Sequence, residues 1–189
     1  MIKSILLAAA LFAGHSAIAD QTSTELPDLF GKLQKAENPQ QAVLIETEIW
    51  KKWYERDEHN GGKRMTNAID AMGTGRYTVA LTLLDQLVDN ESDFAEAWNR
   101  RATVHYLLGN YKESLSDIEK TLTLEPRHFG ALSGIGMIML KLGQTDKALH
   151  AFERVLDISP QNVGASKSVK ELETTVSYTH LTLPTIYSV

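Results

Sequence analysis

The side chains that could act as acids, bases or metal ligands are spread along this chain without a shared pattern. Four histidines lie on different segments and lack the close spacing of metal ligands: His59, His105, His128 and His150. Four aspartates are expected at helix positions that face solvent: Asp70, Asp85, Asp117 and Asp157. These patterns give little support to catalysis and predict no metal site.

Motifs for a nucleophile or a cofactor are absent from the sequence as well. It has no cysteine, no glycine-rich phosphate loop and no Gly-x-Ser-x-Gly nucleophile elbow. We therefore expect a protein that is not an enzyme and that holds no cofactor. An enzyme with an unrecognised type of site is the alternative that these absences leave open.

Composition and charge exclude two further classes of protein. The chain has 189 residues, a formal net charge of −5 and 43% hydrophobic residues. This apolar content is enough for a packed core and excludes a disordered chain. Nucleic-acid binding needs a clustered cationic surface, whereas carboxylates lie near the basic doublets Lys51-Lys52, Lys63-Arg64 and Arg100-Arg101. We expect solvated helix faces there, and no nucleic acid as a partner.

Residues 1–19 have the pattern of a secretory signal peptide. Lys3 supplies the charged start, an apolar stretch follows from Ile5 to Ala13, and small residues end the segment at Ala19. The apolar stretch is too short for a membrane anchor, which needs about 20 such residues. We expect cleavage before Asp20, a periplasmic location and no membrane insertion afterwards.

Residues 176–189 differ in composition from the Lys- and Glu-rich segment before them. The run from Val176 to Thr185 matches one translated frame of a transposase-type sequencing adapter. We expect 176–189 to be such an adapter and not native sequence, so these residues are left out of the reasoning on fold and function. The alternative is a short C-terminal strand.

A 34-residue repeat is the strongest signal in the chain, and it aligns the segments 61–94, 95–128 and 129–162. Each segment holds two helical patterns. Glycine enters the left-handed conformation without strain, so the column of Gly75, Gly109 and Gly143 is expected to end the first helix of each pair. Small residues are expected where the two helices approach, in the columns of Ala68, Ala102 and Gly136 and of Ala80, Ser114 and Ala148.

The second segment carries a family pattern at nearly every signature position. From Ala95 to Trp98, and then at Ala102, Gly109 to Tyr111, Ser114 and Pro126, it resembles the tetratricopeptide repeat. The resemblance covers 61–162. The N-terminal arrangement, including the run from Ile49 to Trp53, also resembles secreted repeat proteins of alphaproteobacteria. The resemblance to the tetratricopeptide repeat implies an all-α solenoid, a right-handed superhelix of three antiparallel helix pairs with a concave protein-binding face. His105 stands in a column that this family usually gives to an aromatic residue, so we expect it to pack between helices.

The segments beside the repeats are expected to cap the array, because the terminal pairs of such arrays expose apolar surface. Residues 20–60 should form an N-terminal helical cap with helices over 26–37 and 39–56, the second with an apolar stripe of Ala42, Ile45, Ile49 and Trp53. Residues 163–175 should form a C-terminal capping helix with Val169 and Leu172 facing inward. Trp50, Trp53 and Tyr54 could form a binding hot spot. Their spacing on one helix favours the other interpretation, a cap packed on the first repeat.

In the tetratricopeptide family, ligands lie along the first helix of each pair. The matching columns predict an apolar, Met-rich groove lined by Met65, Ile69, Met72, Asn99, Arg100, Thr103, Tyr106, Leu107, Ser133, Met137 and Leu140. The alternative is that the N-terminal helices fold back and fill it. Of the columns with which a family subgroup grips a C-terminal carboxylate, only Arg100 fits; the others hold Met65, Ile69, Gly130 and Gly134.

These observations predict a non-catalytic adaptor of the bacterial periplasm, monomeric or weakly associating, that holds a peptide or an amphipathic helix of a partner protein in its groove. A rival from another class is a structural subunit that assembles with itself through exposed cap surfaces.

Overall fold

The computed structural model describes residues 23–54 and 61–181 of the chain. The predictions for residues 1–19 and 182–189, and for His59, lie outside these ranges. The described residues form helices and no strand, which confirms the predicted all-α class. The helices are α1 Leu26–Gln34, α2 Pro39–Tyr54, α3 Gly61–Gly73, α4 Tyr77–Asn90, α5 Ala95–Leu107, α6 Tyr111–Leu124, α7 Phe129–Lys141, α8 Thr145–Ile158 and α9 Val163–Leu181.

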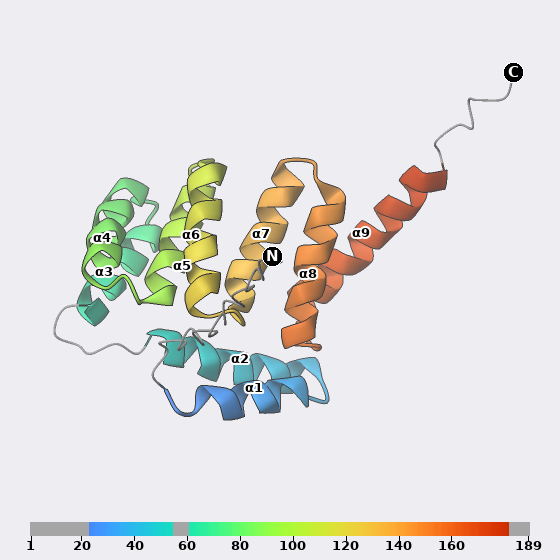
Figure 1. The fold of residues 1–189 in the computed structure, drawn as a ribbon, viewed down its shortest axis with the longest axis horizontal. Helices are drawn as coiled ribbons and strands as arrows, with labels where there is room; N and C mark the ends of the chain where they lie inside the picture. Colours follow the sequence, from blue (N-terminus) through green and yellow to red (C-terminus); the bar gives the residue numbers. More distant parts are fainter. Residues whose placement is uncertain (1–22, 55–60, 182–189) are drawn as a thin grey trace, which may run out of the picture.

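Three helix pairs stand side by side and form the array: α3 with α4, α5 with α6, and α7 with α8 (Figure 1). The first helix of each pair begins at the first residue of the predicted repeat. The glycine column is confirmed, because Gly75, Gly109 and Gly143 have φ values of 72°, 78° and 69°. Only glycine adopts this left-handed conformation at no steric cost, so it ends each first helix sharply.

Small side chains let the two helices of a pair approach, as the repeat predicts. Ala80, Ser114 and Ala148 are buried, and the Ser114 hydroxyl donates a hydrogen bond to the carbonyl oxygen of Ala102 at 2.8 Å. In the third pair, a Cβ atom on Gly136 would lie 2.6 Å from Cζ of Phe152. The absence of that atom makes room for the phenylalanine ring.

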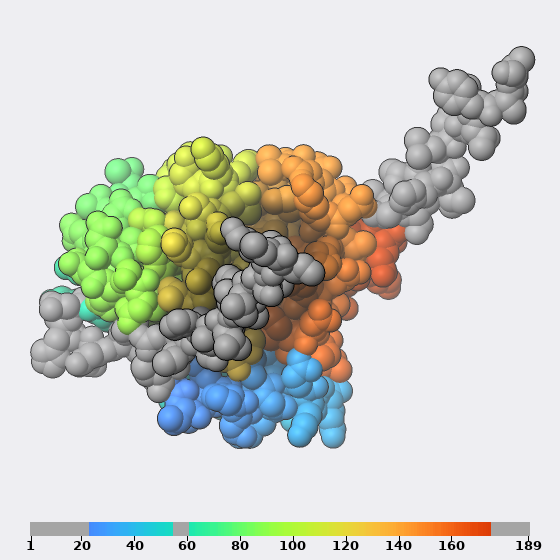
Figure 2. Space-filling model, in the orientation of Figure 1, coloured from blue at the N-terminus to red at the C-terminus, as the bar shows by residue number. Residues whose placement is uncertain are grey.

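The N-terminal hairpin, α1 with α2, lies below the array in Figure 1, crosswise to the array helices and near their lower ends. Its predicted apolar stripe is confirmed: Ala42, Ile49 and Trp53 are fully buried, and Ile45 is half-buried. They share a core cluster with residues of α7, α8 and α9, including Phe129, and in Figure 2 the blue hairpin lies against the orange third repeat. The prediction that Trp50 and Trp53 pack on the first repeat is therefore wrong.

Two polar side chains, at the end of α1 and in the middle of α2, fix this hairpin to the end of α8 and the turn after it. The amide of Gln34 donates hydrogen bonds to the carbonyl oxygens of Asp157 and Ile158. The carboxylate of Glu46 accepts hydrogen bonds from the Ser159 hydroxyl at 2.7 Å and from the Asn162 amide at 2.8 Å. The hairpin is thus positioned by residues that lie far from it in the sequence.

The last helix, α9, covers the C-terminal side of the third pair. As predicted, Leu172 is buried and Val169 packs against the same cluster. The helix continues to Leu181, so the alternative of a strand is wrong for residues 176–181, and the adapter origin of 176–189 stays a prediction. Within 23–54 and 61–181, no helix is long and apolar enough to cross a membrane.

Candidate protein-binding surface

The predicted groove residues lie on α3, α5 and α7, and we call the surface that these residues form the inner face. Its α3 part is largely closed. Met65 is only 2% exposed, and Ile69 and Met72 are half-buried. All three side chains pack into the core cluster that contains Ala68 and Leu84. They therefore contribute to the stability of the first repeat more than to an open surface.

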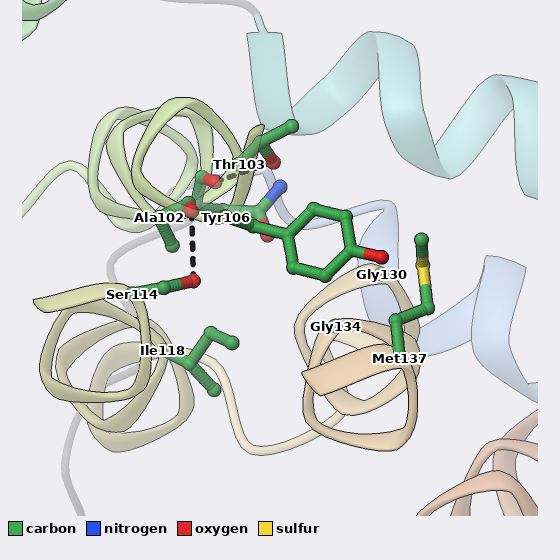
Figure 3. A pocket seen from close by; sticks show the side chains of 9 residues that line it. Ala102, Thr103, Tyr106, Ser114, Ile118, Gly130, Gly134 and Met137 are labelled. Carbon is green, nitrogen blue, oxygen red and sulfur yellow. Dashed lines mark hydrogen bonds between the residues drawn. The ribbon is translucent and has the colours of Figure 1, made fainter. Parts of the chain in front are cut away.

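A pocket of about 110 Å³ opens on the part of the inner face between the second and third repeats. Four predicted groove residues line it: Asn99, Thr103, Tyr106 and Met137. Figure 3 shows the Tyr106 ring pointing from α5 toward α7, with Met137 beyond it. The remaining lining residues are Ala102, Ser114, Ile118, Gly130 and Gly134. Pockets for small molecules are about 300–1,000 Å³, so this one is suited to a single side chain of a partner.

Apolar side chains border this pocket and remain in contact with solvent. Leu107, Met137 and Leu140 are 48%, 44% and 43% exposed. Ser133, in the same row of α7, is half-buried and donates its hydroxyl hydrogen to the carbonyl oxygen of Phe129. We call the surface of Thr103, Tyr106, Leu107, Met137 and Leu140 the open part of the inner face.

The end of the inner face around Arg100 is covered by the C-terminal turn of α2. The Arg100 guanidinium lies over two rings, 5.6 Å from the centroid of Trp50 and 5.0 Å from that of Tyr54. A Cβ atom on Gly130 would come within 2.5 Å of the Trp50 ring, so only glycine leaves room for it there. The N-terminal helices thus fold back onto part of the predicted groove and leave its open part uncovered by α1 and α2.

Beneath this cover lies a buried polar cluster of four side chains. Both Glu96 and His128 are 0% exposed, and Nε2 of His128 lies 3.0 Å from Oε2 of Glu96. The Asn99 amide donates to the same carboxylate oxygen at 3.0 Å, and Arg100 donates to the other. A buried carboxylate is tolerated only when it is paired and hydrogen-bonded in this way.

His128 also caps the first helix of the third repeat. Its Nδ1 accepts a hydrogen bond of 3.1 Å from the backbone N–H of Ala131 and so caps α7. Because Nδ1 accepts, we assign the ring proton of the neutral form to Nε2, which then donates to Glu96. The face of the His128 ring that is turned toward α2 stacks on Trp53, with centroids 4.1 Å apart and planes at 8°.

Burial shifts the pKa values of two members of this cluster, Glu96 and Arg100. It raises the pKa of the Glu96 carboxyl above its ordinary value of 4.5, while the hydrogen bonds from His128 and Asn99 act in the opposite direction. Burial also lowers the pKa of the Arg100 guanidinium to about 10, which still leaves it charged at neutral pH. Arg100 is therefore already engaged by Glu96 and two aromatic rings.

A second charged group joins the first and second repeats away from this cluster. Arg101 donates two hydrogen bonds to Asp117, at 2.8 and 2.7 Å, and one to Asp85 at 2.9 Å. Asp117 is only 4% exposed, so the expectation that it faces solvent is wrong: a cation on the neighbouring helix pairs with it. His105 is half-buried 4.0 Å from Asp117, which fits its expected place between helices.

In the third repeat the same two columns hold apolar residues, Ile135 in place of Arg101 and Ala151 in place of Asp117. Here α7 and α8 enclose a pocket of about 340 Å³. Its floor includes Ile135, Met139 and Ala151, and charged side chains such as Lys147 and Arg154 surround it. This pocket is therefore lined by apolar side chains at the two columns that hold the ion pair in the second repeat.

The residue patterns did not single out Glu96 and His128 as a pair, although one signal was present. His128 stands immediately before the first residue of a repeat, and Asn162, in the same column, caps α9 by accepting from the Ala165 N–H. Asparagine is a common cap residue, so this column marks a cap. No group of histidine and acidic side chains within the described ranges is arranged to hold a metal ion.

Comparisons with known proteins give one consistent result. A family model described as "Tetratricopeptide repeat" matches residues 93–161. A TPR repeat-containing protein of Rhizobium etli is 40% identical over 147 residues, which are 78% of this chain and 72% of that protein. The small glutamine-rich tetratricopeptide repeat-containing protein 2 of Saccharomyces cerevisiae is 29% identical over 102 residues, 54% of this chain and 28% of that protein.

Solved structures share the fold at low sequence identity. The first TPR of Spaghetti (RPAP3), bound to the HSP90 peptide SRMEEVD, has a TM-score of 0.60 at 19% identity and covers 64% of this chain and 96% of its own. The Sgt2 TPR domain of Aspergillus fumigatus has a TM-score of 0.61 at 16% identity, over 69% of this chain and 89% of its own.

Proposed function

The chain belongs to the tetratricopeptide repeat family, and we propose that it is a non-catalytic adaptor of the bacterial periplasm that binds a peptide or an amphipathic helix of a partner protein. Proteins of this family mediate protein–protein interactions. The proposal that the chain binds a peptide or helix rests on the side-chain-sized pocket between α5 and α7, together with the exposed apolar side chains that border it.

The open part of the inner face has the chemistry of a binding groove. A partner that covers the exposed side chains of Leu107, Met137 and Leu140 gains binding free energy, because burial of apolar surface is favourable by about 25 cal/mol per Å². Methionine has three rotatable bonds and adapts to partners of irregular shape. A partner side chain that enters the pocket beside Tyr106 would fix the register of the complex.

The partner proposed is an apolar segment and not an acidic C-terminal tail. A structural neighbour holds the peptide SRMEEVD, which ends in acidic residues. In this chain the carboxylate-binding columns hold Met65, Ile69, Gly130 and Gly134, and Arg100 is engaged by Glu96. No free cation is therefore left for a carboxylate at these columns.

The periplasmic location rests on the signal-peptide pattern of residues 1–19. If the proposal holds, the native cell contains a chain that starts at Asp20 and is released with the periplasmic fraction. Intact-mass analysis of that fraction checks this. A chain that keeps residues 1–19 and stays with the cytoplasm contradicts the location, but not the binding surface.

The binding surface is tested with two charge substitutions, Tyr106→Glu and Met137→Glu. Each places a carboxylate where a partner must bury apolar surface, so we expect at least a tenfold loss of affinity, about 1.4 kcal/mol, for a partner captured from periplasmic extract. Affinity is measured by titration of the purified partner. Met137 is the sharper site because its side chain is 44% exposed and its replacement costs little stability.

Val79→Glu provides the matched control. Val79 is 46% exposed on α4, away from the inner face, and should leave binding unchanged. Circular dichroism verifies that all three variants are folded. If folded Tyr106→Glu and Met137→Glu proteins bind every captured partner as tightly as the wild type, the proposal fails.

A self-assembling subunit is the second candidate, because α2 exposes two adjacent apolar side chains, Val43 at 50% and Leu44 at 68%. We propose a monomer instead, and light scattering over a dilution series separates the two. A constant monomer mass supports the adaptor. A stable oligomer that Leu44→Glu dissociates supports assembly through the hairpin.

A further inference from the structure

The surface covered by α2 has a chemistry of its own, distinct from that of the open part. On the array side it consists of the Arg100 guanidinium, the bare backbone at Gly130 and the rings of His128 and Phe129. On the hairpin side, three aromatic residues meet it, Trp50, Trp53 and Tyr54, at helical spacing i, i+3 and i+4. These positions lie on one side of a helix.

Each of the three rings has a separate place on this surface. Trp50 lies in the space above Gly130, with its centroid 5.3 Å from that of Phe129. Trp53 stacks on His128 at 4.1 Å. Tyr54 stacks on Trp50 at 6.2 Å between centroids and lies under the Arg100 guanidinium. The surface therefore accepts an aromatic helix through shape, stacking and cation–π contacts.

This occupation has features of an exchangeable contact. The buried indole N–H of Trp53 has no hydrogen-bond partner among the described residues, and an unsatisfied buried donor weakens the interface that contains it. The hydrogen bonds that hold the hairpin to α8 and to the turn after it come from Gln34 on α1 and Glu46 in the middle of α2. They involve none of the three aromatic residues, which follow Glu46 in the chain.

We infer that the surface formed by Arg100, His128, Phe129 and Gly130 is a receptor for an aromatic amphipathic helix, filled in cis by α2. A partner helix with Trp or Tyr at positions i, i+3 and i+4 competes with α2 for it. This inference rests on the proposed function, because it extends the inner face from its open part to the Arg100 end. It also predicts that α2 limits how much of the inner face a partner reaches.

The experiment uses the full chain and a fluorescein-labelled synthetic peptide of residues 23–54, with binding followed by fluorescence anisotropy. In the wild type, α2 competes with the peptide. Trp50→Ala weakens the cis occupant and leaves the receptor residues intact. The apparent affinity for a site rises in proportion to the fraction of molecules in which that site is free, so we expect Trp50→Ala to bind the peptide at least about tenfold more tightly.

Two further variants make the result specific. Leu44→Ala, on the exposed side of the same helix, should bind the peptide as the wild type does. Adding Gly130→Leu to Trp50→Ala places a side chain where the Trp50 ring of the peptide must lie, and should abolish the gain. If Trp50→Ala does not fold, the pair Gln34→Ala and Glu46→Ala loosens the hairpin by removing its hydrogen bonds to α8 and the turn after it, with the same expected gain.

Peptide binding that Trp50→Ala or the loosened hairpin does not strengthen, or that Gly130→Leu does not weaken, overturns the inference. Its failure is distinguishable from that of the proposed function, because this assay needs no cellular partner. Peptide binding as expected, together with Tyr106→Glu and Met137→Glu variants that keep every captured partner, would refute the adaptor groove and leave the aromatic receptor standing.

Discussion

His128 links three levels of this structure through one side chain. Its Nδ1 caps α7, its Nε2 hydrogen-bonds to Glu96 in the preceding pair, and its ring stacks on Trp53 of the hairpin. Each contact uses a different part of the imidazole, so no other side chain can replace all three. Substitutions at this residue can therefore separate the cap from the other two contacts.

We expect His128→Ala to lower the free energy of unfolding by about 3 kcal/mol and His128→Asn by about 2 kcal/mol. Asparagine keeps the cap, as Asn162 does for α9, whereas alanine loses it. Both variants lose the contact with Glu96 and the stack on Trp53. Urea unfolding measures the two values, and equal losses would show that the cap contributes nothing.

The buried carboxyl of Glu96 predicts a pH dependence of stability. Burial raises the pKa of Glu96 in the folded protein, so between 4.5 and that raised pKa the folded chain binds more protons than the unfolded chain. The contribution of Glu96 to the free energy of unfolding therefore falls as pH rises through this window.

Glu96→Gln removes this titration. The free energy of unfolding of the variant minus that of the wild type should increase as pH rises above 4.5 and then level off. Taking this difference cancels the contributions of the other carboxylates to the pH dependence of the free energy of unfolding. Urea unfolding at a series of pH values measures it, and a difference that stays constant or decreases with pH contradicts the raised pKa.

At the scale of the helices, the repeat pattern predicted most of what is found. The glycine column, the small-residue columns and the capping pattern are local, because they depend on backbone conformation and on neighbouring helices of fixed spacing. The stripe of Ala42, Ile49 and Trp53 likewise predicted which side of α2 is buried. The stripe could not predict which part of the chain covers that side of α2, because any apolar surface could bury it.

For the same reason the sequence did not predict the candidate site completely. Trp53 and His128 are far apart in the chain, and no local period relates them. Asp117 was assigned to solvent because its partner, Arg101, belongs to another helix. The open part of the inner face was predictable only through the family columns, which place residues on a helix but do not report which of them another segment covers.

Two glycines of α7 allow a sharp test of helix packing. An alanine at 136 would place its Cβ atom 2.6 Å from the buried Phe152 ring, whereas at 134 the nearest atom is the flexible end of Ile118, at 3.1 Å. Alanine gains about 1 kcal/mol of helix propensity at either position. Overpacking costs about 1–3 kcal/mol at 136, so Gly136→Ala should be destabilising by about 1 kcal/mol.

Gly134→Ala, by contrast, should be neutral or stabilising by up to about 1 kcal/mol. Thermal and urea unfolding of the two variants give the comparison. If both substitutions stabilise the protein equally, the close approach of α7 and α8 at Gly136 does not limit packing as the structure indicates.

At the scale of the whole molecule, the hairpin makes the array asymmetric. One core cluster is built around the first repeat, while another joins α1 and α2 to the third repeat and α9. The inner face is divided accordingly. Its α3 part is closed by packing, its Arg100 end is covered by α2, and the part between Thr103 and Leu140 stays open.

This division is tested most directly by hydroxyl-radical footprinting of the full chain with and without a partner purified from periplasmic extract. Bound partner should lower the oxidation of Tyr106, Leu107, Met137 and Leu140, and leave that of Val79 on α4 unchanged. Oxidation that falls at Val79, while those four side chains stay as reactive as in the free protein, would contradict binding at the inner face.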